Sequence, residues 1–497
     1  MAGMPREAAR TAPPRIAIIG CGFAGIGMAI RLMRMGLGTF TIYEAGADVG
    51  GTWRENTYPG AACDIPSHLY SFSFEPNPLW SRTFASQQEI LAYLKRCANK
   101  YGLMPFIRFN ARVAAATFDD DARIWRLELL ANGTRETVEA DVVIAANGPL
   151  SRPALPRIPD IERFAGKLFH SACWDHEYAL EGKRIAVVGT GASAVQFVPR
   201  IQPRVAHLSV FQRTPPWIMP RRDRAISERA KTLFRTFPFT QRLVRYGLYW
   251  QHEVRALGFV VNPKLMKRPM AFSLGYLARR VKDPVLRAKL TPDYQLGCKR
   301  VLLSSDYYPA LAQPNVDLVT APIREIVADG IVTEDGKHHA VDAIICGTGF
   351  KVNDAGAPFS VTGVDGADLD TLWRREGPQA YLGASIAGFP NFFMITGPNT
   401  GLGHNSMVYM IESHIGYVAD CLRTLQRRRV RTMEVRHEAQ CAFNEQLQHA
   451  LRRSVWQTGC RSWYLSESGK NTALWPGFTF SFRRLTRRVR AGDYRFL

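Results

Sequence analysis

Two glycine-rich turns, at residues 20–25 and 189–194, could each hold the pyrophosphate of a dinucleotide. Nineteen residues after the first turn lies Glu44, whose carboxylate would accept hydrogen bonds from ribose hydroxyls and repel a 2′-phosphate. The same offset from the second turn reaches Arg213, a guanidinium suited to a 2′-phosphate, and Thr214 adds a hydroxyl donor. The first site therefore suits FAD or NAD, and the second suits NADPH.

Each turn stands where a strand should pass into a helix. Residues 15–19 form a short apolar run, a helical pattern covers 26–34, and a second apolar run covers 40–44. Residues 183–188 form the matching run before the second turn, whose third small position is Ala194. A lone glycine motif is a weak signal, but strand, turn, helix and strand in this order are typical of a dinucleotide-binding unit. We predict an α/β fold with two Rossmann-like domains.

Between the two turns lies a stretch with five informative positions. These are Phe164, Gly166, His170, Trp174 and Asp175. They fill every fixed position of F-x-G-x-x-x-H-x-x-x-W-[P/D], so the stretch resembles the fingerprint of type I Baeyer–Villiger monooxygenases. Related flavin enzymes that oxidise nitrogen or sulfur usually end this stretch in Tyr or Phe. The alternative is an ordinary interdomain loop with packed aromatics. We expect the fingerprint to join two cofactor domains.

The resemblance runs from about residue 15 to 484, and the tail resembles the hydroxyacetophenone and steroid monooxygenase subgroup. Residues 50–70 resemble the segment that wraps FAD in flavin monooxygenases, which assigns FAD to the first turn. The family aspartate that orients the active-site arginine corresponds to Asp64, which would otherwise be an ordinary turn residue. The adjacent Lys299 and Arg300 resemble the family pair that approaches the NADP phosphate and stabilises the oxygenated flavin.

The resemblance implies a set of cofactor contacts. Those expected for FAD are Gly20, Gly22, Phe23, Ala24, Gly25, Glu44, Gly51, Thr52, Trp53, Asp64, Tyr70, Val113 and Met407. Those expected for NADPH are Gly189, Thr190, Gly191, Ala192, Ser193, Ala194, Arg213, Thr214, Lys299, Arg300 and Trp463. Arg300 and Asp64 are the expected catalytic residues, and no metal is expected.

The implied reaction converts a ketone into an ester or lactone. NADPH reduces FAD, the reduced flavin captures O2 as a C4a-peroxide, and Arg300 keeps that peroxide anionic so that it attacks the carbonyl carbon. Sulfides are expected as further substrates. Two alternatives stay open. One is an N- or S-oxygenating flavin monooxygenase, and the other is a basic surface-binding protein that carries flavin only as structure.

The chain is expected to divide into discontinuous domains. Residues 221–297 carry a helical, basic and aromatic pattern that suggests an insertion within the NADPH domain. The expected divisions are a flexible tail (1–13), the first part of the FAD domain (14–150), the fingerprint with the first part of the NADPH domain (151–220), the helical insertion (221–297), the second part of the NADPH domain (298–382) and the C-terminal part of the FAD domain (383–497).

The composition limits the kinds of partner that the protein is expected to bind. With 46% hydrophobic and 22% charged residues the chain is globular, and no window approaches the roughly 20 apolar residues of a membrane span. A formal net charge of +21 could suit polyanions, but no nucleic-acid-binding motif accompanies it, so no nucleic acid is expected. Contact with acidic membrane surfaces stays open. Nine cysteines without a C-x-x-C pair, and a start without a secretory signal, predict reduced thiols in a cytoplasmic protein.

Overall fold

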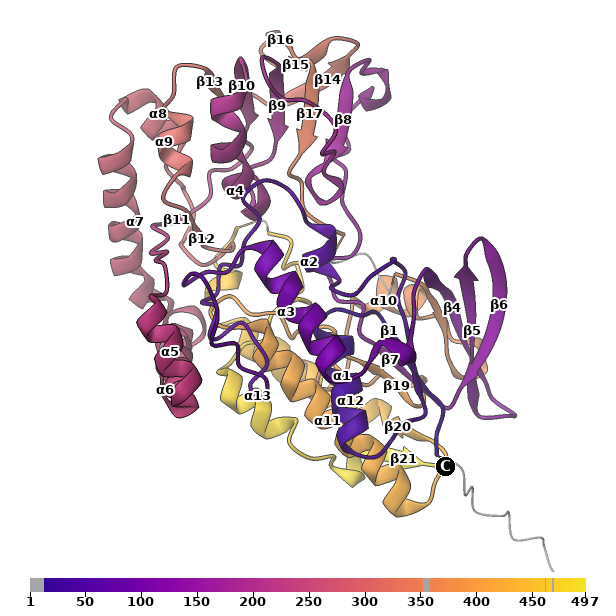
Figure 1. Cartoon of the computed structure of the whole chain (residues 1–497). Helices are drawn as coiled ribbons and strands as arrows, with labels where there is room; N and C mark the ends of the chain where they lie inside the picture. The colour runs from indigo at the N-terminus through magenta and orange to yellow at the C-terminus, as the bar shows by residue number, and fades with distance from the viewer. Residues whose placement is uncertain (1–12, 352–357, 461, 467–468) are drawn as a thin grey trace, which may run out of the picture.

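A computed structural model of the chain describes residues 13–351, 358–460, 462–466 and 469–497. The expected N-terminal tail, except for residue 13, lies outside the described residues. Two five-stranded sheets, each parallel throughout, form the centre of the molecule (Figure 1). Their strands are buried because helices cover one face of each sheet and a smaller sheet covers the other. The predicted α/β class is therefore confirmed.

The first sheet carries the N-terminal glycine turn. Its strands follow the order β19 (Phe392–Met394), β7 (Val142–Ala145), β1 (Ile16–Ile19), β2 (Phe40–Tyr43) and β3 (Ile107–Arg108). Helices α1 (Phe23–Arg34) and α11 (Met407–Arg428) share one hydrophobic core on this sheet. Because β1 lies between β2 and the much later β7, the turn after β1 opens at a switch point of strand order, where α/β sheets bind dinucleotides.

The second sheet repeats this arrangement around the second glycine turn. Its strands follow the order β13 (Val316–Val319), β10 (His207–Phe211), β9 (Arg184–Val188), β17 (Ala343–Cys346) and β8 (Lys167–His170). Helices α4 (Ala192–Ile201) and α9 (Tyr307–Leu311) pack on it within a separate core. Strand β9 has β10 on one side and β17 on the other, so its turn also opens at a switch point.

Smaller sheets flank these two. A four-stranded sheet contains β18 (Ser360–Thr362), β4 (Ala111–Asp119), β5 (Ile124–Ala131) and β6 (Thr134–Ala140). A three-stranded sheet contains β14 (Ile323–Val327), β15 (Gly330–Thr333) and β16 (His338–Ala340). Strands β20 (Met433–Val435) and β21 (Tyr494–Phe496) pair antiparallel, which returns the C-terminus to the first domain.

Further helices complete the first domain. They are α2 (Thr52–Glu55), α3 (Gln87–Lys100), α10 (Leu369–Glu376), α12 (His437–Leu451) and α13 (Thr479–Leu485). Helix α3 begins after Ser86, whose side chain accepts a hydrogen bond from the Glu89 amide. The Glu89 carboxylate accepts hydrogen bonds from the Ser81 amide and hydroxyl.

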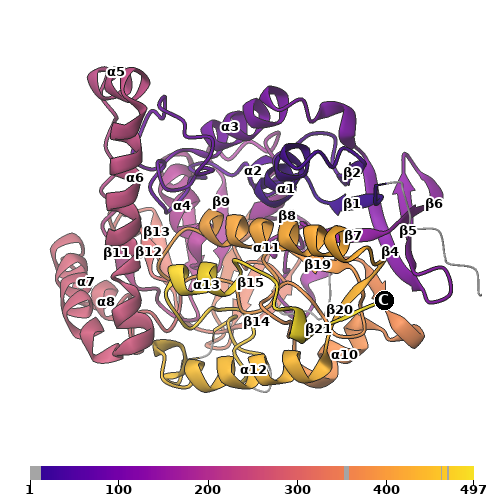
Figure 2. The ribbon, with the colours of Figure 1, turned by 90° about the horizontal axis from the view of Figure 1, so that it is seen from below.

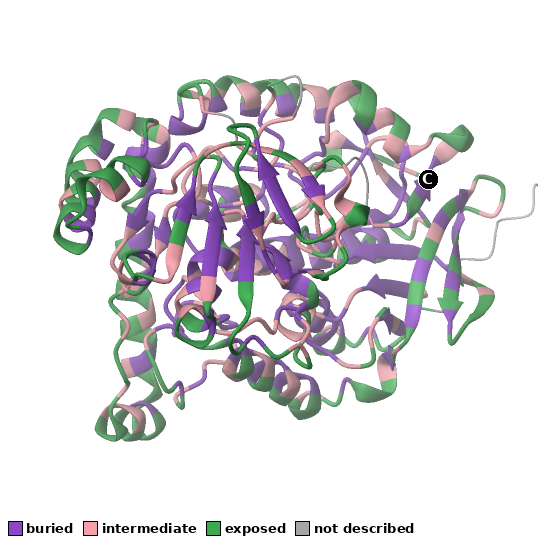
Figure 3. Ribbon diagram, turned by 90° about the horizontal axis from the view of Figure 1, so that it is seen from above, coloured by how far each residue is buried: buried purple, intermediate pink, exposed green. Residues whose placement is uncertain are grey.

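Four helices separate β11 (Ile218–Met219) from β12 (Leu302–Leu303), two short strands that pair in parallel. These helices are α5 (Glu228–Thr236), α6 (Pro238–Glu253), α7 (Lys267–Arg280) and α8 (Pro284–Lys289). They form the outer left edge of the molecule in Figures 1 and 2. Figure 3 shows that buried residues concentrate in the central strands and exposed residues on the outer helices. The exact domain boundaries stay a prediction.

Candidate active site

The first glycine turn brings several backbone segments into close contact. Gly20 has a φ of +102°, which favours glycine, and a β-carbon there would lie 2.9 Å from the carbonyl oxygen of Ala146. A β-carbon on Gly25 would lie 1.9 Å from the carbonyl oxygen of Gly20, so a side chain would drive α1 away from β1. A β-carbon on Gly22 would lie 3.6 Å from the Cα of Gly51. The N-terminus of α1 and these bare backbones form a cradle that fits a pyrophosphate.

Glu44 stands at the end of β2, beside this cradle, and is only 5% exposed. Its Oε2 accepts a hydrogen bond from the Cys21 amide at 2.8 Å, and its Oε1 accepts one from the Gly46 amide at 2.8 Å. Arg54 Nη1 forms an ion pair with Oε1 at 2.9 Å. These contacts hold the carboxylate where a ribose would lie next to the phosphates, and its charge opposes a further phosphate there.

The segment that follows lies against the same turn. Thr52 opens α2, and Trp53 Nε1 donates a hydrogen bond to the Tyr70 hydroxyl at 3.3 Å. The Tyr70 ring also meets the Phe23 ring edge-on, with centroids 5.2 Å apart, at the start of α1, where Ala24 is buried. The structure thus brings these five expected FAD contacts to one end of the first sheet.

Two expected flavin contacts come from other elements. Met407 is the first residue of α11, directly after Ser406, whose side chain accepts a hydrogen bond from the Val408 amide. Val113 lies on β4 and is 5% exposed, within the hydrophobic core between that strand and the first sheet. Both assignments stay predictions.

The second glycine turn repeats the close approach seen in the first. Gly189 has a φ of +104°, and a β-carbon there would lie 2.7 Å from the carbonyl oxygen of Gly347. The expected contacts at the start of α4 are Gly191, Ala192, Ser193 and Ala194. Ala194 is fully buried, so a larger side chain at position 194 would not fit. A β-carbon on Gly347 would lie 3.2 Å from the Ala194 methyl group, so position 347 is crowded as well.

Two basic side chains gather beyond the second turn. Arg213 is exposed just after β10, and the next residue, Thr214, accepts a hydrogen bond at its carbonyl oxygen from Thr190 Oγ1 at 3.3 Å. Burial and the nearby charge of Arg213 both lower the pKa of Lys299. Lys299 Nζ also lies 4.8 Å from the centre of the Tyr294 ring. This pair of cations, formed from residues distant in sequence, fits the charge of a 2′-phosphate.

Arg213→Ala should weaken NADPH binding by about 10–150-fold, roughly 1.5–3 kcal/mol, because it removes a charge-assisted contact to the 2′-phosphate. NADH binding, measured by titration of the same protein, is the internal control and should change little. Arg213→Lys should recover part of the loss, since it keeps the charge without the planar fork. Equal weakening of both coenzymes would show that Arg213 supports the fold instead.

Asp64 and Arg300, which lie 236 positions apart, form an ion pair at the interface of the two domains. Arg300 Nε donates to Asp64 Oδ2 at 3.0 Å, and Arg300 Nη2 donates to the same oxygen at 2.5 Å. The Arg300 side chain is 37% exposed and that of Asp64 is 27% exposed, so the pair borders accessible space. The structure therefore brings together the two residues expected to be catalytic.

The pair holds both groups in their charged forms. Burial opposes ionisation of Asp64, but the charge of Arg300 and the hydrogen bonds to the carboxylate together outweigh it, so the pKa of Asp64 lies below its ordinary value. The Asp64 charge raises the pKa of Arg300 despite burial. The ionised Asp64 therefore adds to the free energy of unfolding at pH values above the ordinary aspartate pKa of about 3.9. This contribution is lost as the pH falls through the lower pKa that Asp64 has in the folded protein.

Tyr464 is a neighbour of this pair that the sequence did not single out. It is 1% exposed, and burial raises its pKa to about 12 although the Arg300 charge opposes the shift, so its hydroxyl stays protonated. The Arg300 and Asp64 charges both act on this hydroxyl. The ring of Trp463 lies 4.5 Å from that of Tyr464 and is 47% exposed. The role of Trp463 at NADPH stays a prediction.

Cys298 and Cys460 form a disulfide in the structure, with Cα atoms 6.2 Å apart. The prediction of uniformly reduced thiols is wrong for this pair, while the other seven cysteines are free. The cysteines lie 162 positions apart, so no local spacing indicated them, and only the fold brings them together. The bond joins the segment just before Lys299 and Arg300 to the loop that carries Trp463.

The fingerprint is an edge of the second sheet and not a free linker. Its residues 167–170 form β8, which pairs with β17. A β-carbon on Gly166 would lie 2.6 Å from the carbonyl oxygen of Asp342, which explains the glycine. The Trp174 ring is 9% exposed and packs 5.3 Å from the Phe197 ring on α4.

The polar fingerprint residues have structural contacts. Asp175 forms an ion pair with Lys167 at 2.7 Å and caps the Glu177 amide at 3.0 Å. His170 Nδ1 accepts a hydrogen bond from the Ala172 amide at 3.0 Å, and burial lowers the pKa of His170. Phe164 packs against the hydrophobic core between the second sheet and the three-stranded sheet. These residues stabilise the end of β8 and the turn that follows it.

The second domain meets the FAD-wrapping segment directly beyond the fingerprint. His176 lies 2.7 Å from the Thr57 hydroxyl. Gln196 on α4 accepts a hydrogen bond from the Tyr58 hydroxyl at 3.0 Å and donates one to the carbonyl oxygen of Ala62 at 2.9 Å. The helix that opens at the second turn is therefore bonded to the segment that leads to Asp64.

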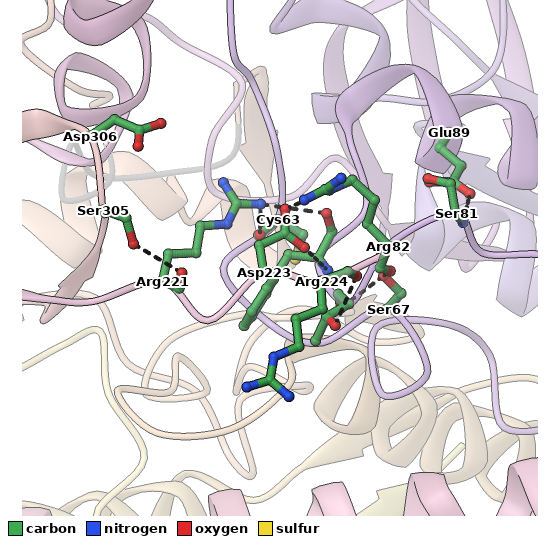
Figure 4. Close-up of polar contacts among 12 residues, drawn as sticks. Cys63, Ser67, Ser81, Arg82, Glu89, Arg221, Asp223, Arg224, Ser305 and Asp306 are labelled. Atoms are coloured by element: carbon green, nitrogen blue, oxygen red, sulfur yellow. Dashed lines mark hydrogen bonds and ion pairs between the residues drawn. The ribbon is translucent and has the colours of Figure 1, made fainter. Parts of the chain in front are cut away.

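Arg221 is a second cation near Asp64 that sequence reasoning missed. Figure 4 shows its guanidinium reaching the backbone of Cys63. Its Nη2 donates to the carbonyl oxygens of Cys63 at 3.3 Å and Phe84 at 3.5 Å, and its own carbonyl accepts from Ser305 Oγ at 3.0 Å. Burial lowers the pKa of Arg221. Because Cys63 precedes Asp64, Arg221 positions the backbone that carries Asp64. In the sequence it resembles ordinary surface charge.

Arg221→Met should lower the ester formed per NADPH by about fivefold, roughly 1 kcal/mol, because two hydrogen bonds that hold the Asp64 segment are lost. Arg222→Met removes an exposed neighbouring charge and is the matched control. Product and NADPH are measured together, since a purely structural defect would lower both in proportion. The same ratio in both variants would contradict a positioning role.

A buried polar cluster lies at the start of α11. Asn405 Nδ2 donates to Glu253 Oε2 at 2.6 Å, and the Thr479 hydroxyl donates to the same oxygen at 2.8 Å. Burial lowers the pKa of His404 to about 3, so its ring is neutral. This cluster anchors the inner face of α6 to the starts of α11 and α13.

No group of three or more His, Cys, Asp or Glu suited to a metal occurs among the described residues. No helix in the described part of the chain is long and apolar enough to cross a membrane.

Comparison with known proteins agrees with this geometry. Residues 13–236 match the family model described as flavin-binding monooxygenase-like. A Baeyer–Villiger monooxygenase of Pseudomonas aeruginosa is 53% identical over 482 residues, which cover 97% of this chain and 91% of that protein. The solved structure of an oxidized steroid monooxygenase bound to NADP is 30% identical with a TM-score of 0.85, covering 98% of this chain and 100% of that one. OTEMO in complex with FAD and NADP is 29% identical, with the same TM-score and coverage.

The fold and the site thus define a two-dinucleotide flavin-binding monooxygenase. The chain belongs to the Baeyer–Villiger monooxygenase family. The resemblance predicted from the fingerprint and the two turns is confirmed.

Proposed function

We propose that this protein is an FAD- and NADPH-dependent Baeyer–Villiger monooxygenase that converts ketones into esters or lactones with O2. The observation that carries this proposal is the Asp64–Arg300 pair, which lies between two dinucleotide cradles of opposite ribose chemistry. Family membership over 97% of the chain supports the reaction class. The similar solved structures that hold FAD and NADP support the cofactor pair.

The two cofactors fit different cradles for electrostatic reasons. FAD fits the first, where the buried Glu44 carboxylate stands ready for ribose hydroxyls. NADPH fits the second, where Arg213 and Lys299 bring positive charge to the position of a 2′-phosphate. When bound, FAD supplies hydride acceptance and oxygen activation, chemistry that amino-acid side chains lack. The protein supplies position, charge and exclusion of water.

Arg300 supplies the fixed positive charge that oxygen insertion requires. Negative charge develops on oxygen as the carbonyl carbon is attacked, and a preorganised cation stabilises that charge without reorganising at the moment of reaction. Asp64 accepts hydrogen bonds from Nε and Nη2 of the Arg300 guanidinium. The remaining N–H donors of Arg300 are left for the reacting oxygen. The Tyr464 hydroxyl, protonated at neutral pH, borders the same space.

A ketone is the substrate class that this site favours, and oxidation of sulfides stays a prediction. The N- or S-oxygenating alternative has no need of an anion-stabilising pair such as Asp64 and Arg300. The non-catalytic flavin carrier has no need of Arg213 and Lys299. The expected cytoplasmic location also stays a prediction.

The test is a panel of cyclic, linear and aromatic ketones incubated with the purified protein, NADPH and O2. The protein should be yellow and release FAD rather than FMN, and at least one ketone should accelerate NADPH oxidation and yield an ester or lactone. Amines and sulfides run in parallel are the control for electrophilic oxygenation. A colourless protein that FAD cannot reconstitute, or one that forms N-oxides and no ester, would contradict the proposal.

A further inference from the structure

Helix α6 at the outer edge of the molecule is held to the protein by one face only. On its inner face Gln241 donates to the carbonyl oxygen of Asn77 at 2.6 Å, and Arg245 donates to the carbonyl oxygen of His68 at 2.8 Å. Figure 2 shows α6 as a long column near the margin, with α5 at one end and α7 and α8 farther out beside the other end. The opposite face of α6 therefore points away from the protein.

That opposite face is apolar. Its side chains, which we call the outer stripe, are Phe239, Leu243, Tyr246, Trp250 and Val254. They recur every three or four residues and so lie on one face of the helix. Leu243 is 63% exposed and Tyr246 is 62% exposed. A stripe of this spacing normally packs against a core, yet the side chains of this one remain 40–63% exposed.

The apolar surface extends beyond α6. After the helix the chain forms a π-helical turn, η5 (Leu257–Val261), and a 3-10 turn, η6 (Pro263–Met266), before α7. Phe480 on α13 is exposed, and its ring centre lies 6.1 Å from that of Trp250. Further exposed apolar side chains of the insertion are Leu233, Phe237, Val244, Leu257, Val261, Leu265, Phe272 and Leu274. Exposed patches of this extent usually mark interaction sites.

The charges around this surface are predominantly positive. Residues 229–282 contain a single carboxylate, Glu253, which is fully buried in the cluster with Asn405 and Thr479. The basic residues of the same range are Arg229, Lys231, Arg235, Arg242, Arg245, Arg255, Lys264, Lys267, Arg268, Arg279, Arg280 and Lys282. The exposed carboxylates of Glu228 and Asp283 flank this range, and Glu228 forms an ion pair with Lys231 at 2.7 Å. Between them the insertion presents apolar and cationic side chains to its surroundings.

We propose that the outer stripe and its surrounding cations bind the surface of an anionic phospholipid bilayer. The helix would lie in the plane of the interface, with the stripe among the acyl chains and the arginines and lysines at the headgroups. Tyr and Trp suit the boundary between headgroups and hydrocarbon, and lysines and arginines are attracted to anionic lipid. This mode needs no spanning helix.

Other occupants match the surface less well. A second copy of the chain would bring two predominantly cationic surfaces face to face, and their few carboxylates would offset little of the repulsion. Single-stranded nucleic acid would use the aromatic side chains and the positive charge, but Leu243 and Val254 would add nothing to its binding. A bilayer uses the aliphatic, the aromatic and the cationic side chains together.

The test is co-sedimentation of the full-length holoenzyme with vesicles. The protein should bind vesicles of equimolar phosphatidylcholine and phosphatidylglycerol. Its affinity for pure phosphatidylcholine vesicles should be lower by a factor of about ten or more. Raising the salt to about 1 M, where the screening length is about 3 Å, should weaken binding to the anionic vesicles. Equal binding to both vesicle types, or binding to neither, would overturn the proposal.

Substitutions in the outer stripe test whether it is the surface that binds lipid. The double variant Leu243→Asp and Tyr246→Asp should bind anionic vesicles on the order of 10–100-fold more weakly, because charges replace two apolar side chains that would enter the bilayer. The matched control is Leu130→Asp with Leu155→Asp, which changes two exposed leucines outside the insertion and should bind normally. Charge reversal by Arg242→Glu with Lys267→Glu should also weaken binding. Unchanged binding in the stripe variant would overturn the assignment.

Two further readouts separate the competing occupants. Turnover of a small water-soluble ketone should be equal in all variants, so a failure of lipid binding is distinguishable from a failure of the proposed function. Sedimentation velocity without lipid should show the same mass for the wild type and the stripe variant. A self-associated species that the stripe variant loses, or tighter binding of single-stranded RNA than of vesicles, would overturn the lipid proposal.

Discussion

Replacing Arg300 with alanine is expected to stop most ester formation while NADPH oxidation continues. Oxygen insertion develops negative charge that a fixed cation must offset, and removing one preorganised donor typically costs about 3–4 kcal/mol, a factor on the order of 10²–10³. Hydride transfer from NADPH depends more on geometry than on this charge and should slow less. Arg300→Ala should therefore consume NADPH, release hydrogen peroxide and form little ester.

The measurement pairs stopped-flow reduction of the flavin with product analysis. Arg300→Lys keeps the charge but lacks the planar fork that binds Asp64, so it should rescue only part of the activity. Asp64→Ala should give a milder loss, because Arg300 would remain but would no longer be held in place. Normal ester yield from Arg300→Ala would refute its assignment as a catalytic residue.

Trp174→Ala is expected to destabilise the second domain by about 3–5 kcal/mol while FAD stays bound. The Trp174 ring is buried between the rings of Phe169 and Phe197, each 5.3 Å away, in the core under the second glycine turn. Its loss should disturb α4, whose N-terminus forms the NADPH cradle. The first sheet has its own core and should keep its cofactor.

Thermal unfolding and the flavin spectrum of the same samples test this prediction. The variant should melt earlier, retain FAD absorbance and lose coupling between NADPH oxidation and ester formation. Trp174→Phe retains a ring in the same cavity and is the matched control, with a smaller effect expected. A Trp174→Ala variant that oxygenates normally, or one that simply loses FAD, would show that the fingerprint does not act through the second domain.

Local features of the sequence determined much of this protein. Gly20 and Gly25 indicated where a strand passes into a helix, because a bare backbone is needed where the two approach within contact distance. The matched offsets of Glu44 and Arg213 indicated two cradles of opposite charge. These features depend on neighbours a few positions away, or on one supersecondary unit, and can therefore be read from sequence order and residue type.

The fingerprint shows where such reading stops. Its residue types and spacing were enough to identify the family, which the comparisons confirmed. They did not reveal that residues 167–170 form the edge strand of the second sheet, because that pairing is made with β17, far along the chain. The expected linker became part of a domain core once that strand was in place.

Only the tertiary structure decided the long-range partnerships. The ion pair between Asp64 and Arg300 spans 236 positions, and the Cys298–Cys460 disulfide spans 162. Arg221 could be recognised as a positioning residue only when its guanidinium was seen beneath the Asp64 segment. The physical reason is the same in each case: a side chain has the same identity whether it is solvated or buried, and its partner is chosen by how the sheets and helices pack. Packing likewise decided that the apolar stripe of α6 faces outward, since its periodicity alone would have predicted a buried face.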